Sequence, residues 1–118
     1  MAYGNGVFAA LSNGSSTAAS STDGITWALR TLPLSASWFG IAYGNGVFAA
    51  VSSSTTAASS TDGITWALRT MPTNTFFHAV AFGNGLFVAT SYIASTGAAS
   101  STDGITWTAR TLPAASSW

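Results

Sequence analysis

The chain repeats itself three times, and this repetition constrains its fold more than any other feature. One phrase, Thr-Asp-Gly-Ile-Thr-Trp, occurs at 22–27, 61–66 and 102–107. A second, Tyr-Gly-Asn-Gly-Val-Phe, occurs at 3–8 and 43–48, and returns as Phe-Gly-Asn-Gly-Leu-Phe at 82–87. A period of about 40 residues is typical of propellers, solenoids and arrays, whose units bury their apolar faces against one another. We therefore expect residues 1–118 to form a single segment of three units, approximately 1–38, 39–77 and 78–118.

The composition excludes several classes of partner. Three Arg and three Asp balance to zero net charge in a chain that is 47% hydrophobic. Without a basic patch, binding to nucleic acid is not expected. No apolar run approaches the roughly 20 residues that span a bilayer, so no membrane partner is expected. The absence of Cys excludes disulfides and thiolate metal sites, and the cellular compartment stays open.

The local pattern predicts strands and no helix, because no stretch keeps an apolar period of 3.6 residues. In the middle unit we expect strands at 38–43, 47–52, about 56–60 and 64–70. The Asn45-Gly46 pair is a strong hairpin signal, since both central positions of a type I′ turn require positive φ. Pro72 is predicted to end the fourth strand. Four short antiparallel strands in each unit predict an all-β chain of three four-stranded β-propeller blades.

The phrase Ser/Thr-x-Asp-Gly-x-Thr-Trp also resembles the Asp-box, or BNR repeat, of sialidase-type propellers, in all three units. The usual family pattern, Ser-x-Asp-x-Gly-x-x-Trp, has one more residue between Asp and Gly. In that family the box is a structural turn, so the resemblance implies an architecture and no activity. From the residues themselves, each carboxylate is expected to accept backbone N–H groups across its own turn, and each Trp to pack between neighbouring blades. These structural residues are Asp23, Gly24, Trp27, Asp62, Gly63, Trp66, Asp103, Gly104 and Trp107.

Differences between the units predict where a ligand would bind. The loop between the second and third strands varies in length, at 13–16, 53–54 and 92–96, and the crossing between units varies in sequence, at 34–37 and 73–76. In an up-and-down blade both segments lie at the same end, and variable loops on a rigid scaffold carry specificity. A second interpretation stays open, in which Trp38, Phe77 and Trp118 fill the core between blades. The candidate ligand-binding residues are Trp38, Asn74, Phe76, Phe77, His78, Tyr92 and Trp118.

Catalysis is not expected. The chain has no Glu, and its Asp and Arg residues occupy repeat-equivalent positions that do not converge, so the paired carboxylates of a glycosidase are missing. His78 is the single histidine, which excludes a Ser-His-Asp triad or a His-cluster metal site within one chain. We expect no enzyme activity, no cofactor and no metal.

Three blades cannot close a ring, so we expect the chain to associate with copies of itself. The segment 1–3 aligns with 41–43, and Trp118 aligns with Trp38, so the end of one copy is expected to complete the first strand of the next. Head-to-tail association closes into a ring when the rotation fits. Small residues along the first two strands favour a nine-blade trimer over a six-blade dimer.

The sequence supports three functional hypotheses. The first is a non-enzymatic, self-assembling propeller scaffold, and its near-exact repeats and low charge are typical of a designed or consensus-derived sequence. The second is a multivalent, lectin-like propeller that binds carbohydrate. The third is a structural module of a phage or cell surface.

Overall fold

The protein, seen in a computed structural model that describes residues 1–93 and 95–118, is all-β. Its strands pair in antiparallel fashion throughout the described residues, as the sequence predicts. Within the same residues, no helix is long and apolar enough to cross a membrane. The strands are β1 (Ala2–Gly4), β2 (Val7–Leu11), β3 (Asn13–Ser21), β4 (Ala28–Gly44), β5 (Val47–Ser52), β6 (Thr56–Ser60), β7 (Ala67–Thr70), β8 (Phe77–Gly83), β9 (Leu86–Ser91), β10 (Ser95–Ser101) and β11 (Thr108–Ser116).

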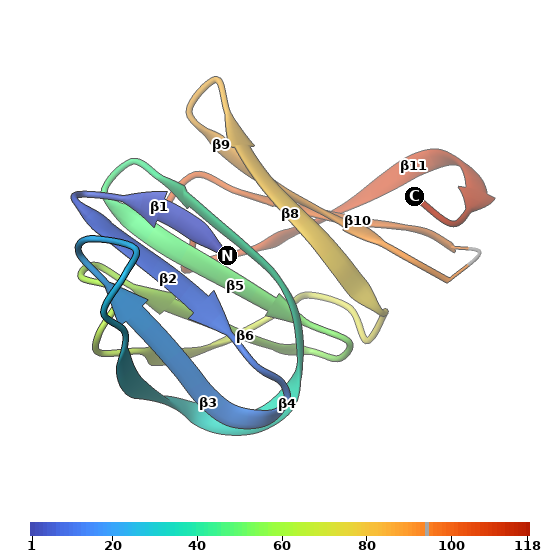
Figure 1. Ribbon diagram of the computed structural model, residues 1–118. Helices are drawn as coiled ribbons and strands as arrows, with labels where there is room; N and C mark the ends of the chain where they lie inside the picture. Colours follow the sequence, from blue (N-terminus) through green and yellow to red (C-terminus); the bar gives the residue numbers. More distant parts are fainter. Residues whose placement is uncertain (94) are drawn as a thin grey trace.

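The strands form three successive ladders of four. β4 is long enough to belong to two of them: its first part pairs with β3 and its second part, from Trp38, pairs with β5. Figure 1 shows β4 turning from the edge of one ladder into the start of the next. The first ladder is therefore β1-β2-β3-β4, the second is β4-β5-β6-β7 and the third, a separate sheet, is β8-β9-β10-β11.

The predicted Asn-Gly hairpins are present in all three ladders. Asn5, Asn45 and Asn84 have φ values of 49°, 50° and 51°. The glycines that follow them also have positive φ, between 75° and 79°. Two consecutive residues with positive φ match the type I′ turn, whose twist fits the flanking strands.

Of the four strands predicted for the middle unit, two agree with the structure and two differ. The first, predicted at 38–43, is the second part of the longer β4, Ala28–Gly44. β5 and β6 cover 47–52 and 56–60, as expected. The prediction that the fourth strand begins at Ile64 is wrong, because β7 begins at Ala67. The backbone N–H groups of Ile64 and Thr65 donate to the Asp62 carboxylate, which withdraws them from the ladder.

The proline after the fourth strand ends that strand only in the middle unit. β4 continues through Pro33 and β11 through Pro113, whereas β7 ends at Thr70. In the first unit the residues predicted as a loop extend β3 instead, and Asn13 and Ser15 pair with Ser37 and Ala36. Pro33 lies where the register shifts, so its missing N–H costs no ladder bond.

Two apolar cores lie between the ladders. The core between the first and second ladders contains Ala9, Ala18, Leu32, Trp38, Phe48, Ala50, Ala58 and Trp66. The core between the second and third contains Ala42, Ala49, Val51, Ala57, Met71, Phe77, Phe87, Ala89, Ala99 and Trp107. Successive residues of β5 therefore point alternately into the two cores, because side chains alternate across a strand. The middle ladder is covered on both faces, and the outer two on one face each.

Glycines allow the ladders to approach each other closely. The ring of Tyr43 lies on the backbone of Gly4, and the ring of Phe82 lies in the same way on Gly44. A Cβ at either glycine would overlap the ring above it. Each contact joins the aromatic residue of one ladder to the glycine of the preceding ladder.

We expect Gly44→Ala to destabilise the chain by roughly 1–3 kcal/mol, because the added methyl group must displace the Phe82 ring from the core. The measurement is urea unfolding followed by tryptophan fluorescence. An unchanged midpoint and slope would mean that the Phe82 ring moves aside without cost.

Candidate functional site

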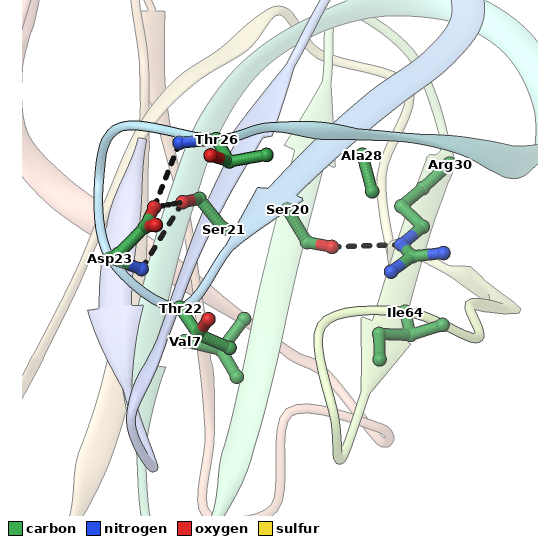
Figure 2. A pocket seen from close by; sticks show the side chains of 9 residues that line it. All are labelled: Val7, Ser20, Ser21, Thr22, Asp23, Thr26, Ala28, Arg30 and Ile64. Carbon is green, nitrogen blue, oxygen red and sulfur yellow. Dashed lines mark hydrogen bonds between the residues drawn. The ribbon is translucent and has the colours of Figure 1, made fainter.

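Each Asp-Gly turn is built around its carboxylate. Asp23 Oδ1 accepts the N–H groups of Ile25 and Thr26, both at 2.8 Å, and the Ser21 hydroxyl at 2.9 Å. Ser21 Oγ in turn accepts the N–H of Gly24 at 2.9 Å. Figure 2 shows the bonds that join Asp23 to Ser21 and to Thr26. The turns at Asp62 and Asp103 repeat these bonds. The predicted role of the carboxylates is confirmed: they satisfy backbone donors of their own turns.

These bonds hold the carboxylates in the ionised form. The N–H groups of Ile25 and then Thr26 lower the pKa of Asp23 below its ordinary value of 3.8. The equivalent N–H groups lower the pKa of Asp62, with Thr65 contributing most, and of Asp103, with Ile105 contributing most. A carboxylate with a lowered pKa is a poor general acid or base near neutral pH.

The arginines are also bound within their own ladders. Arg30 Nε donates to Ser20 Oγ at 2.8 Å, across the pair formed by β3 and β4, and Arg69 and Arg110 make the same bond. Arg30 and Asp23 line a hollow of about 420 Å³, over which Ile64 of the next ladder lies (Figure 2). No group of three or more His, Asp or Glu side chains in residues 1–93 and 95–118 is placed to hold a metal ion.

The first ladder leaves one face uncovered. Trp27 is 40% exposed, whereas its equivalents Trp66 and Trp107, which lie in the two cores as predicted, are each 7% exposed. Tyr3 is 59% exposed, while its equivalent Tyr43 covers Gly4. Ile25 is 84% exposed, about twice the value of its equivalents. We call the surface formed by Tyr3, Gly24, Ile25 and Trp27 the first face.

The third ladder is uncovered on the face that does not pack against the second ladder. Among the described residues, no atom outside Gly83 and its two chain neighbours lies within 4 Å of the Gly83 Cβ position, although the equivalent positions of Gly4 and Gly44 are each covered by an aromatic ring. Val88 is 40% exposed, whereas its equivalent Ala49 is fully buried. Leu86 lines an open hollow with Ser100 and Arg110. We call the surface formed by Gly83, Leu86, Val88, Ser100 and Arg110 the last face.

Aromatic residues line a second hollow, of about 220 Å³, between the second and third ladders. The His78 ring lies between two others, with centroids 4.8 Å from Phe39 and 4.9 Å from Tyr92, and each pair is tilted by 33°. The candidate residues Phe76 and Phe77 complete the lining. The structure thus brings four of the seven predicted ligand-binding residues together: Phe76, Phe77, His78 and Tyr92.

The other three candidates lie elsewhere. Trp38 is 2% exposed within the core, and Phe77 in the hollow wall is fully buried, so both rings pack between ladders. Asn74 is exposed in the segment between β7 and β8. Trp118 is also exposed, and its indole N–H lies 3.2 Å from the carbonyl oxygens of Ser95 and Ala114. In the predicted variable loop 92–96, residue 94 lies outside the described residues.

Sequence reasoning did not identify Phe39 or Gly83 as functional. Phe39 is the repeat equivalent of His78, and this equivalence is the sequence signal from which their neighbouring positions could have been predicted. For Gly83 the sequence shows only a glycine that recurs in each unit. The contact that the equivalent glycines, Gly4 and Gly44, make with a ring of the following unit becomes visible only when the ladders are packed together.

Acidification should unfold the protein through the Asp turns. Because the folded-state pKa values lie below the unfolded value of 3.8, the stability from these carboxylates is present above about pH 4 and is lost as the pH falls through the lowered values. We expect thermal denaturation to show a falling midpoint below about pH 4. Asp62→Asn should lower the midpoint at pH 7 and weaken this pH dependence, with Thr73→Ala, in an exposed loop, as control. Identical acid limbs in wild type and Asp62→Asn would contradict the role of Asp62.

No protein-family model matches the sequence, and no curated protein matches it. The roles of the first face, the last face and the aromatic hollow are therefore inferred from their residues and geometry.

Proposed function

We propose that the chain is a self-assembling scaffold: three β-propeller blades that associate head to tail with copies of themselves into a closed ring. The observation that carries this proposal is the complementarity of the first and last faces. The first face has aromatic side chains without a glycine beneath them, and the last face has the glycine without an aromatic side chain above it. Within the chain, the same two features meet twice.

The internal contacts specify how the faces would meet. Tyr43 covers Gly4 and Phe82 covers Gly44, so Tyr3 of the partner subunit would cover Gly83. Val7 contacts Gly63, and Val47 contacts Gly104, at 3.2 Å from the Cβ positions. By the same offset, Leu86 would contact the partner subunit's Gly24. Residues equivalent to both of these pairs already meet at the two interfaces between ladders within the chain.

A third contact follows from the hollow in Figure 2. Ile64 lies over the hollow formed by Val7, Ser20 and Arg30 of the preceding ladder. The hollow at Leu86, Ser100 and Arg110 is formed by the repeat-equivalent residues, with Leu86 in place of Val7, and no residue of another ladder lines it among the described residues. Ile25 of the partner subunit would lie over it. Burial of the exposed Ile25, Trp27, Tyr3 and Val88 side chains supplies the driving force.

Strand pairing at the place where two copies would join also supports head-to-tail association. Trp38 pairs with Ser52, and Phe77 with Ser91, at the start of the first strand of a ladder. β1 begins only at Ala2, and Ser12, the equivalent of Ser52 and Ser91, is exposed. Trp118 of the partner subunit is the residue that would pair there, which would lengthen β1 to match β8.

Closure favours three copies over two. Head-to-tail association extends without limit unless the rotation between successive copies closes a ring. Gly40 lies so close to β8 that its Cβ position is 3.1 Å from Val80 N and 3.2 Å from the His78 carbonyl oxygen. Such close approach suits ladders that stack at a small angle, and for this reason we propose nine blades from three copies rather than six from two. The near-identity of the units is also why we propose a designed or consensus-derived origin.

The native mass of the purified protein tests the assembly. We expect about 36 kDa, three chains of 11.9 kDa, by light scattering or native mass spectrometry. A mass of about 24 kDa would replace the trimer by a six-blade dimer. A stable, folded monomer at micromolar concentration would refute the scaffold proposal.

Gly83→Ala tests the contact between the two faces. Its methyl group enters open space in the single chain but occupies the position proposed for the partner's Tyr3 ring. We expect the mass to fall toward that of one chain at low micromolar concentration while the circular dichroism spectrum stays that of a β protein. Thr73→Ala, in an exposed loop outside both faces, should keep the mass of the wild type.

Tyr3→Ser removes the ring that we propose covers Gly83, and it is expected to lower the native mass as Gly83→Ala does. Association of Gly83→Ala and Tyr3→Ser as strong as that of the wild type would show that the copies meet elsewhere. Since Gly83 has no neighbour to clash with inside the chain, loss of folding in Gly83→Ala alone would also contradict the proposed geometry.

A further inference from the structure

The aromatic hollow gathers residues at which the repeats differ from one another. Phe76, in the crossing between the second and third units, stands where the other crossings have Ser37 and Ser117, and Tyr92 stands where the first two units have Asn13 and Ser53. These departures are far apart in sequence and line one hollow. In a chain whose units are otherwise nearly identical, their convergence singles out this location.

Two β-bulges direct rings toward this hollow. The register shifts between Trp38 and Gly40, which leaves Phe39 without a ladder partner. A matching shift between Phe77 and Ala79 leaves His78 without one. Bulges re-aim side chains and are common beside functional sites. The result is the stack of Phe39, His78 and Tyr92, with exposed rings at both ends.

The hollow is separate from the faces that we assign to assembly. Its lining comes from the second and third ladders of one chain, which already pack against each other through Met71 and Phe77. The first and last faces lie on the outer sides of the first and third ladders. Ring formation therefore leaves the aromatic hollow open, and a trimer would carry three of them.

The chemistry of the lining favours a small, neutral ligand with both apolar and polar parts. No charged residue of the chain is among the residues that line the hollow. Phe39, Phe76 and Tyr92 are 43%, 50% and 53% exposed, so their rings can be contacted from solvent. The exposed His78 imidazole and the Tyr92 hydroxyl are the polar groups of the lining, and each can both donate and accept hydrogen bonds.

The volume limits the ligand to about one ring. At about 220 Å³ the hollow is smaller than the roughly 300–1,000 Å³ typical of sites for drug-sized ligands. We propose that it binds one neutral pyranose unit of a carbohydrate. The C–H face of the sugar would pack on an exposed aromatic ring, and its hydroxyl groups would bond to His78 and Tyr92. Such a site combines apolar contact with a few placed polar groups, as small-molecule sites generally do.

The test is an NMR titration of the assembled ¹⁵N-labelled protein with the methyl β-glycosides of glucose, galactose and N-acetylglucosamine. Tetramethylammonium serves as a comparison probe, because aromatic cages also bind quaternary ammonium groups. We expect at least one glycoside to cause saturable shifts at Phe39, Phe76, His78 and Tyr92, with a dissociation constant of about a millimolar or below.

Two variants replace hollow residues by those of the other units and should therefore fold. Tyr92→Ser and Phe76→Ser are each expected to weaken binding of the glycoside about tenfold, the usual loss for one stacking contact. Leu68→Ser, at an exposed apolar residue of β7, should leave the affinity unchanged. All three should keep the native mass of the wild type, so a failure of assembly is distinguished from a failure of sugar binding.

Three results would overturn the proposal: no saturable shift with any glycoside, shifts centred outside the hollow, or glycoside affinity unaffected by both hollow variants. Saturation by tetramethylammonium alone would overturn it as well and would identify the hollow as a cation cage.

Discussion

The contact of an aromatic ring with a bare glycine backbone determines how closely the ladders pack, and the rest of the structure depends on it. Tyr43 on Gly4 and Phe82 on Gly44 bring neighbouring ladders close enough that alanines make up half of the buried residues of the cores. A side chain at either glycine would force the ladders apart and open voids, which protein interiors tolerate poorly. The same contact is incomplete at Gly83 and at Tyr3, and this is the basis on which we propose association with a further copy.

The turns show how a chain with six charged residues stabilises its loops. Each carboxylate satisfies two backbone N–H groups and a serine hydroxyl, and each guanidinium bonds to a serine on the adjacent strand. The charges are thus used inside the ladders, and none lines the aromatic hollow.

Much of the local structure was predictable because short-range signals decide it. Asn-Gly pairs set the hairpins, and the bounds of β5 and β6 followed from alternation and turn residues. The start of β7 was missed because the Asp62 carboxylate competes with the ladder for two N–H groups. The continuity of β4 was missed because Pro33 usually ends a strand, and only pairing with the extended β3 shows that its N–H is not needed. Of the residues that line the aromatic hollow, Phe76, Phe77, His78 and Tyr92 were predicted from the sequence, and Phe39 was not.

The sequence by itself determined the repeat, the all-β class, the hairpins and the Asp turns, since these depend on residues close together in the chain. Only the tertiary structure decided which copies of a repeated residue are covered. Trp27 and Trp66 have identical local sequences, but one is 40% exposed and the other 7%, because a ladder packs against only the second. Burial of this kind depends on what lies across an interface, and no local pattern records it.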